Sequence, residues 1–490
     1  MKLNRDLLLM ISEKFQNDRI SLYSCLLVNR SWCEAIVPIL WKIPGQAILT
    51  EKAENIIFNV ILSHFSEESR DNLMKQGIDL FTEIYQTPSF NYIYFWRHLD
   101  LQLLDRMISR NFDKSDISMM RNELLKLFVN NNTNFISLFF PYDYKCQVNW
   151  NKQCFSNLKF FYFCNNIDQN ILKELATISK SIKIFNCDVM GCNISGIIRL
   201  IEDQKNLDSV RISKCYQYET CWQSIEEVLI KKAITIQNLY LSYNWNFDVD
   251  LKFLSHFVNL KSLEIIESFG PPNPNNTILN LNQSEKMSLP ALKILKTNQV
   301  SFMMLTRLIE SANVQLTVID IHFNDIYCEF EDVRRFFQAM CQNCPNIKYL
   351  SFPIKDYVLI EFESLLINCQ HLIGLVIRSE GGLQYKNLFK ILNKSSPSSL
   401  IKFGFTLNRK FGAKYKLLRS FLANWKGRHT MLLQIWPVNY CLEDEQEVKR
   451  LYELIEYYEA RGIVKKIDWE IDWCSNDSEE SIWIKKRCFH

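Results

Sequence analysis

One spacing of apolar residues recurs along most of the chain: apolar-x-x-apolar-x-apolar, where x is often polar. Leu207, Val210 and Ile212 form one clear copy. The last two apolar positions alternate with other residues, which is typical of a β-strand that buries one face. Thirteen copies occur, and their first positions are residues 135, 158, 182, 207, 236, 260, 292, 316, 347, 372, 400, 432 and 464. The pattern therefore predicts one short strand in each copy.

Between these strands the apolar residues follow a helical spacing, which is clearest in residues 331–343. There they fall at i, i+3, i+4 and i+7 and share one helix face. These residues are Val333, Phe336, Phe337 and Met340. The first strand positions lie about 27 residues apart on average, within the range of leucine-rich repeats.

We therefore predict an α/β fold in which residues 131–490 form a curved leucine-rich-repeat solenoid of about 13 repeats. Parallel strands would lie inside and helices outside. A set of unrelated buried strands is the alternative. Residues 269–290 contain Pro271, Pro272 and Pro274, which exclude a helix, so a loop is expected there.

Three short apolar helices are expected in the first 41 residues. Asn4 can cap a helix over residues 5–15, and a second helix follows the turn at Asn17 and Asp18. The spacing Ser31-x-x-Glu34 is a capping-box pattern that predicts the start of the third helix. Pro38 and Trp41 are expected to close this unit. So small a unit cannot bury all its apolar faces alone, so a partner or another part of the chain must cover them.

These residues resemble an F-box. The matches to the family motif are Leu3, Asp6-Leu7-Leu8, Ile11, Cys25-Leu26-Leu27-Val28, Arg30-x-Trp32 and Trp41. The block Val28-Asn29-Arg30-Ser31-Trp32 is the most specific part, and the resemblance covers about 45 residues. Asn4 departs from the proline that the family prefers, although asparagine also starts a helix well. The whole chain resembles the F-box leucine-rich-repeat proteins of fungi.

The resemblance implies a substrate-recognition subunit of a Skp–cullin–F-box E3 ubiquitin ligase. Residues 1–45 would bind a Skp-family adaptor and, through it, a cullin–RING ligase, while the repeats would hold an unknown protein substrate. The residues expected at the adaptor are Leu3, Leu7, Leu8, Ile11, Leu26, Val28, Arg30, Trp32 and Trp41. The alternative is a ubiquitin-independent leucine-rich-repeat scaffold whose N-terminal helices are only an end cap.

Residues 46–130 are expected to form a rigid helical connector, because they lack the Pro, Gly and Ser content of a flexible linker. The aromatic run at residues 90–98 is expected to pack between the N-terminal helices and the solenoid. On the strands, the x positions carry both signs of charge and scattered aromatics, which suits a protein ligand better than a polyphosphate. None of them is assigned as a substrate contact.

Net charge, apolar stretches and cysteine content indicate which partners and compartments to expect. The 490 residues carry a net charge of +3, so no nucleic-acid partner is expected. No apolar stretch is long enough for a membrane span, and no secretory signal is expected. A cytoplasmic or nuclear protein with reduced thiols is the expectation for its 16 cysteines.

The common enzyme motifs are absent from the sequence. It contains no H-x-x-x-H pair, no G-x-S-x-G elbow and no phosphate-binding loop of the Walker type. Cys341 and Cys344 form the only C-x-x-C pair, and one such pair is a weak metal signal. We therefore expect a non-catalytic receptor subunit with no catalytic residues, no cofactor and no metal.

Overall fold

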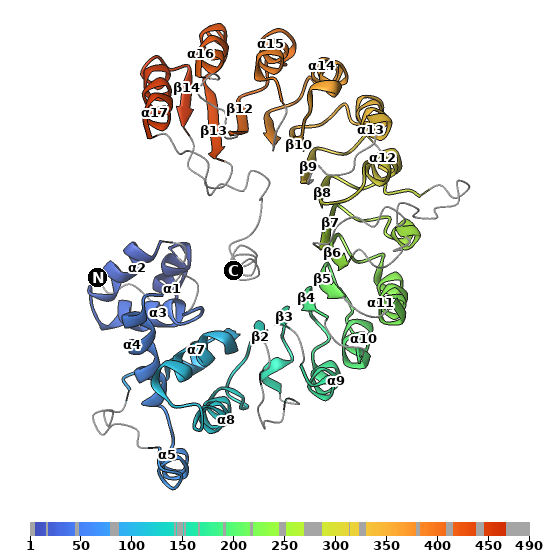
Figure 1. The fold of residues 1–490 in the computed structure, drawn as a ribbon. Coiled ribbons are helices and arrows are strands. Elements are labelled where there is room, and N and C mark those ends of the chain that lie inside the picture. The colour runs from blue at the N-terminus through green and yellow to red at the C-terminus, as the bar shows by residue number, and fades with distance from the viewer. Residues whose placement is uncertain are drawn as a thin grey trace. The chain divides into compact units, whose positions relative to one another are not determined.

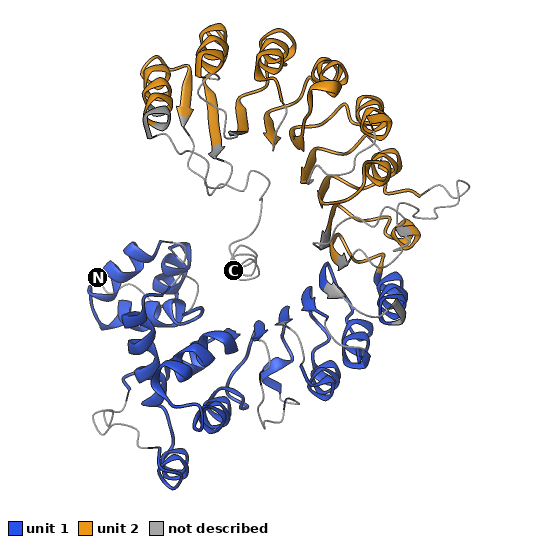
Figure 2. Ribbon diagram, viewed as in Figure 1, with its two compact units in different colours: residues 1–232 blue, residues 233–490 orange. Residues whose placement is uncertain are grey.

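The computed structural model describes residues 5–15, 18–44, 49–78, 88–141, 144, 150, 153–164, 167–189, 193–215, 219–244, 251–268, 287–312, 314–322, 330–378, 383–407, 415–437 and 445–466. The chain divides into two compact units, residues 1–232 and residues 233–490 (Figure 2). This division falls inside the range predicted as one solenoid.

In each unit the strands pair in parallel with their neighbours in chain order, which is the arrangement expected of stacked repeats (Figure 1). The strands of the first unit are β1 (His98–Asp100), β2 (Ser137–Phe140), β3 (Phe160–Cys164), β4 (Ile184–Asp188) and β5 (Ser209–Cys215). Those of the second unit are β6 (Asn238–Asn244), β7 (Ser262–Ser268), β8 (Ile294–Asn298), β9 (Val318–His322), β10 (Tyr349–Pro353), β11 (Gly374–Arg378), β12 (Lys402–Leu407), β13 (Met431–Pro437) and β14 (Val464–Lys466).

Helices connect the strands and lie on their outer side (Figure 1). The first unit contains α1 (Arg5–Lys14), α2 (Arg19–Leu26), α3 (Arg30–Leu40), α4 (Glu51–Leu62), α5 (Glu67–Met74), α6 (Tyr92–Phe95), α7 (Leu101–Asn111), α8 (Ile117–Phe128), α9 (Gln169–Ile178), α10 (Ser195–Glu202), α11 (Glu219–Lys232) and the 3-10 turn η2 (Gln153–Phe155). The second contains α12 (Phe302–Ser311), α13 (Phe330–Asn343), α14 (Leu359–Asn368), α15 (Tyr385–Ser395), α16 (Tyr415–Asn424), α17 (Glu445–Glu459) and the 3-10 turns η3 (Leu251–His256) and η4 (Asp356–Val358).

The repeat positions form the core between the strands and these helices. Leu207, Val210 and Ile212 are buried, and so are Phe336 and Phe337 on the inner face of α13. In the repeats of β1 to β12 all three strand positions are buried against a helix or turn, so within each unit the core extends along the row of strands. The predicted α/β fold, a leucine-rich-repeat solenoid with helices at its N-terminal end, is confirmed.

The sheet begins earlier than the repeat pattern predicted. Strand β1 lies in the range expected to hold only a helical connector, and Leu99 pairs in register with Leu138 of β2. Trp96, Leu99 and Leu101 are buried and follow the repeat spacing. This copy is hard to identify from the sequence because a tryptophan holds its first position. In addition, a helix begins at its third position.

Strand β13 has a different register from the predicted one. Phe403 of β12 pairs with Leu433 and Phe405 pairs with Ile435, so Leu433 and Ile435 hold the second and third repeat positions. The predicted copy that began at Leu432 is therefore wrong by two residues. The true first position is Thr430, a polar residue that the apolar pattern could not identify.

Two further predictions fall partly on residues that the structure does not describe. Val464 does begin β14, but Ile467 and Trp469 of that copy lie outside the described residues. Most of the expected loop over residues 269–290 also lies outside them.

A polar side chain joins neighbouring repeats at the edge where helices lead into strands. The Nδ2 atom of Asn259 donates to the carbonyl oxygen of Ile234 at 2.8 Å, and Nδ2 of Asn346 donates to that of Val314 at 2.9 Å. Ser399 Oγ donates to the carbonyl oxygen of Gln370 at 2.8 Å. In each case the donor directly precedes the first apolar position, and the acceptor lies two residues before that position in the preceding repeat. We call this bond the edge rung.

Candidate functional site

The three N-terminal helices, residues 5–44, are here called the helical module. Helices α1 and α2 both pack on α3. Asp18 caps α2, because its carboxylate accepts from the backbone N–H of Ser21 at 3.1 Å and from the Ser21 hydroxyl at 2.6 Å. These bonds to Ser21, led by the one from its hydroxyl, hold the pKa of Asp18 below its ordinary value.

Helix α3 starts earlier than predicted, and Trp41 directly follows its last residue. Its cap is Asn29, whose side-chain oxygen accepts from the backbone N–H of Trp32 at 3.1 Å. The predicted capping box that began at Ser31 is therefore wrong, and Glu34 instead forms an exposed ion pair with Arg30 at 3.0 Å. The helix continues past Pro38, which lies inside it.

The interior of the module is small and apolar. Leu8 is only 2% exposed, and Leu22, Ile36 and Val37 are also buried. Ser12 is buried beside them, and its hydroxyl donates to the carbonyl oxygen of Leu8 at 2.6 Å, which satisfies the polar group. Leu8 is therefore a core residue and offers no side-chain surface to a partner.

The outer side of α1, of α2 and of the turn that follows α2 is rich in exposed apolar side chains. We call these seven residues the apolar surface: Leu7, Met10, Phe15, Ile20, Tyr23, Leu27 and Val28. Ile20 is 81% exposed and Leu27 is 88% exposed, so neither helps to hold the module together. Of 18 large apolar side chains that are exposed in the described residues, these seven fall within the first 28 positions. Such a concentration is typical of a protein-binding surface.

The nine residues expected at an adaptor separate into distinct environments. Leu7, Val28 and Arg30 are exposed, while Ile11, Leu26 and Trp32 are half-buried. Leu8 is buried, and Leu3 lies outside the described residues.

Sequence reasoning missed five members of the apolar surface: Met10, Phe15, Ile20, Tyr23 and Leu27. The sequence offered no signal for them, because apolar side chains of the core and of this surface are chemically alike.

Trp41, the ninth expected residue, faces the connector. Its ring centroid lies 4.5 Å from that of Tyr92, the first residue of α6. The backbone N–H of Arg97 also donates to the carbonyl oxygen of Lys42 at 3.1 Å. Burial raises the pKa of the Tyr92 phenol, which agrees with its place in this packed joint.

His64 links α4 to the same region. The backbone N–H of Tyr92 donates to Nε2 of His64 at 3.2 Å. Its Nδ1 atom lies 2.7 Å from the carbonyl oxygen of Val60, and its Nε2 atom lies 3.2 Å from that of Phe90. The ring is thereby fixed between α4 and the segment that leads into β1.

Ion pairs join the connector helices. The buried carboxylate of Glu54 on α4 accepts from Arg106 at 3.0 Å and also from Arg110, both on α7. Asp105 on α7 pairs with Arg121 on α8 through two bonds of 2.6 and 2.8 Å. These contacts fix α4, α7 and α8 to one another.

In the second unit, charged side chains meet on the strands. Asp320 of β9 lies 3.2 Å from Arg378 of β11 and 3.4 Å from His322, and Arg378 also contacts His322. Burial, followed by the positive charges of Arg378 and Lys296, lowers the pKa of His322 to about 4, although Asp320 opposes the shift. The cluster combines both charge signs with a neutral imidazole at physiological pH.

The described residues also bear on metal-binding and membrane-spanning sites. Within them, no three His, Cys, Asp or Glu side chains gather in a group that could hold a metal ion. Among their helices, none is both long and apolar enough to cross a membrane.

No protein-family model matches the chain, and no curated protein matches it. One solved structure that is similar is the crystal structure of the leucine-rich-repeat-containing protein LegL7 from Legionella pneumophila, with 11% sequence identity and a TM-score of 0.35. The match covers 65% of this chain and 97% of that chain. The leucine-rich-repeat assignment therefore depends on the strand register and the buried repeat positions of this chain itself.

Proposed function

We propose that the helical module is an F-box that binds a Skp-family adaptor, and that the chain is the substrate-recognition subunit of a cullin–RING ubiquitin ligase. The apolar surface on α1 and α2 carries this proposal, because seven large apolar side chains stay exposed while Leu8, Leu22 and Ile36 already fill the interior. Burial of such side chains at the centre of an interface supplies most of its binding free energy.

The repeats would then hold a protein substrate. A row of parallel strands offers a series of side chains at fixed spacing, and in the second unit these include Tyr240, Glu264 and Asp320. The chain itself would do no chemistry. It would raise the effective concentration of substrate lysines near the ubiquitin-charged enzyme. The tight joint between module and connector supports this role, since it would keep the adaptor at a fixed distance from the first repeats.

Adaptor binding is tested by charging the apolar surface. The double variant Ile20→Asp and Leu27→Asp changes two residues that are almost fully solvated, so we expect it to fold normally. Co-purification of a Skp-family adaptor should be lost with this variant. Ile360→Asp is the matched control, because Ile360 on α14 is 79% exposed but lies in the second unit. Equal adaptor recovery with the double variant and the control would refute the F-box.

A ubiquitin-independent scaffold is the second candidate, with the helical module as an end cap of the repeats. The contacts of Trp41 with Tyr92 and of Lys42 with Arg97 support a capping role. Deletion of residues 1–44 should then destabilise the first unit, while no adaptor is captured by the full chain. The two roles are compatible, and adaptor capture decides between a receptor and a scaffold alone.

A further inference from the structure

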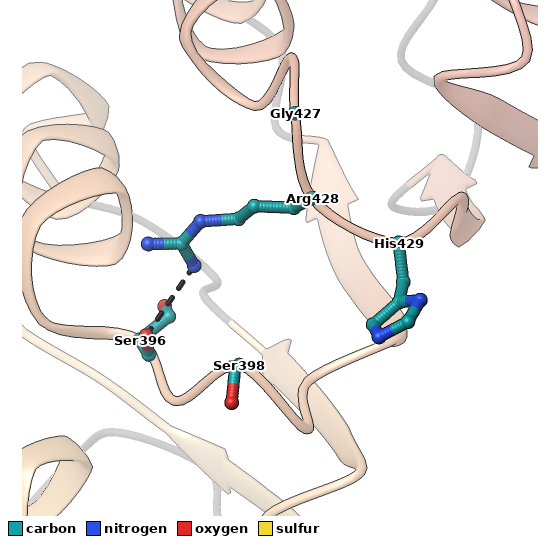
Figure 3. Close-up of a pocket in the computed structure, with 5 residues that line it drawn as sticks. All are labelled: Ser396, Ser398, Gly427, Arg428 and His429. Carbon is teal, nitrogen blue, oxygen red and sulfur yellow. Dashed lines mark hydrogen bonds between the residues drawn. The ribbon is translucent and has the colours of Figure 1, made fainter.

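A cavity of about 410 Å³ lies at the helix-to-strand edge of the second unit, between the repeats of β12 and β13. Its lining residues are Ser396, Ser398, Gly427, Arg428 and His429. Figure 3 shows that they come from two neighbouring turns, one between α15 and β12 and the other between α16 and β13. The volume is within the range of small-molecule sites.

The cavity lies where the edge rung is absent. By the register of β13, His429 holds the donor position of its repeat, and Ser398 holds the acceptor position of the preceding one. Asn259 and Asn346 make the rung at the same donor position. Among the described residues, the His429 ring makes no such bond, and the space between it and Ser398 belongs to the cavity.

Arg428 is held in one orientation at this cavity. Its Nη1 donates to the carbonyl oxygen of Ser396 at 3.3 Å, and its Nη2 donates to that of Asn393 at 3.1 Å. The guanidinium also lies over the Trp425 ring, 4.5 Å from its centroid. A guanidinium has five N–H groups and a permanent positive charge, so three donors remain beyond these two bonds.

The other polar groups of the lining also favour an anion. Ser396 is only 8% exposed, and its hydroxyl has no hydrogen-bond partner within the described part of the chain. This hydroxyl is also closed off from solvent, so the donors that a ligand can reach beside Arg428 are those of Ser398 and His429. Ser398 adds a hydroxyl and His429 an imidazole N–H, while none of the five lining residues is acidic.

We propose that this cavity is a phosphate-binding site, which takes either a phosphate monoester on another protein or free inorganic phosphate. The guanidinium of Arg428 neutralises the anion, and the hydroxyl of Ser398 and the ring of His429 donate to it. Donors that approach from two turns can each reach a separate oxygen of a tetrahedral phosphate, whereas the two oxygens of a carboxylate lie in one plane. The bound phosphate takes the place of the missing edge rung.

Calorimetric titration of the full-length chain tests this site with two probes, inorganic phosphate and N-acetyl-phosphoserine amide, at constant ionic strength. At least one should bind with a dissociation constant below about 1 mM. Arg428→Gln should weaken binding at least about tenfold. Lys426→Gln removes the same charge from the same turn but not from the lining, and it should leave the affinity within about twofold.

A second variant works by closing the cavity rather than by removing charge. His429→Asn places an asparagine at the donor position, where Asn259 and Asn346 make the edge rung in their own repeats. The variant should therefore form the edge rung and lose phosphate binding. Its thermal stability should not decrease. His371→Asn is its control, because His371 holds the same position in another repeat and is outside the lining. Because His429→Asn does not disturb the bonds of Arg428, it tests the site even if Arg428→Gln impairs folding.

The outcomes separate the two sources of the anion. Phosphoserine amide binding at least about tenfold tighter than phosphate identifies a phosphorylated protein as the ligand, and equal affinities identify free phosphate. The proposal is overturned if neither probe binds at concentrations up to about 10 mM. It is also overturned if His429→Asn binds phosphate as tightly as His371→Asn.

Discussion

The indole of Trp41 lies against the phenol ring of Tyr92, with 4.5 Å between the ring centroids and 40° between the planes. Trp41 ends α3 of the helical module, and Tyr92 begins α6 beside the first strand of the sheet. This contact joins the module to the rest of the first unit at a position where the F-box resemblance implies an adaptor contact. Trp41 is therefore expected to act mainly through packing.

Replacement of Trp41 tests that role. Trp41→Ala should lower the free energy of unfolding by about 2 kcal/mol, less than for a fully buried tryptophan because Trp41 is only half-buried. Chemical denaturation measures the loss. Tyr92→Phe keeps the ring and should change stability by less than about 0.5 kcal/mol. If Trp41→Ala leaves stability unchanged but abolishes adaptor binding, Trp41 contacts the adaptor directly.

Removing the two arginines that pair with Glu54 should lower the free energy of unfolding more than replacing Glu54 itself. Its carboxylate is buried, whereas the side chains of Arg106 and Arg110 are each nearly half exposed. Removing both arginines leaves a buried charge without a cation, at a cost of about 3 kcal/mol. Glu54→Gln leaves two arginines that water can still hydrate, so the free energy of unfolding should fall by only about 1 kcal/mol. Urea unfolding of the two variants measures the difference, and equal losses would contradict this account.

The repeat spacing predicted most strands because most of them bury three regularly spaced apolar residues. The spacing failed to identify a strand where a repeat position holds a residue other than an aliphatic one. At β1 the first position is Trp96, which was read as part of an aromatic cluster. At β13 the first position is the polar Thr430, so the spacing was assigned to Leu432. Only the hydrogen-bond register between strands resolves such cases.

The candidate binding surface was less predictable than the fold. Leu7 and Leu8 are adjacent and chemically alike, yet Leu7 is exposed and Leu8 is buried. A motif assigns both to one function, whereas helix geometry places them about 100° apart around the axis. Ile20 and Leu27 were missed because no intrinsic property distinguishes an exposed leucine or isoleucine from a core residue. Packing of α2 on α3 makes the distinction.

The edge rung should make a measurable contribution to stability. Asn346→Ala removes the bond to the Val314 carbonyl and should lower the free energy of unfolding by about 1 kcal/mol. Gln342→Ala is a control, since Gln342 is an exposed residue on the same α13 and should change stability by less than about 0.5 kcal/mol. Thermal unfolding compares the two, and equal midpoints would show that the rung contributes nothing.

His98 should make the stability of the first unit depend on pH. Its ring is buried, with Nδ1 2.7 Å from the hydroxyl oxygen of Ser137. Burial, followed by the positive charges of Lys42 and Arg97, lowers the pKa of His98 to about 3. The ordinary pKa of histidine is about 6.5, so the unfolded chain takes up this proton far more readily than the folded chain does.

The sign of the effect follows from that difference. Above pH 6.5 the ring is neutral in both states and its contribution to stability is fully present. As the pH falls from about 6.5 toward about 3, only the unfolded state is protonated, and stability decreases by about 1.4 kcal/mol per pH unit. His98→Gln cannot be protonated, so the difference in unfolding free energy between wild type and variant should shrink steadily as the pH falls from 6.5 to 4. Parallel pH profiles for the two proteins would show that His98 is protonated in the folded state as readily as in the unfolded one.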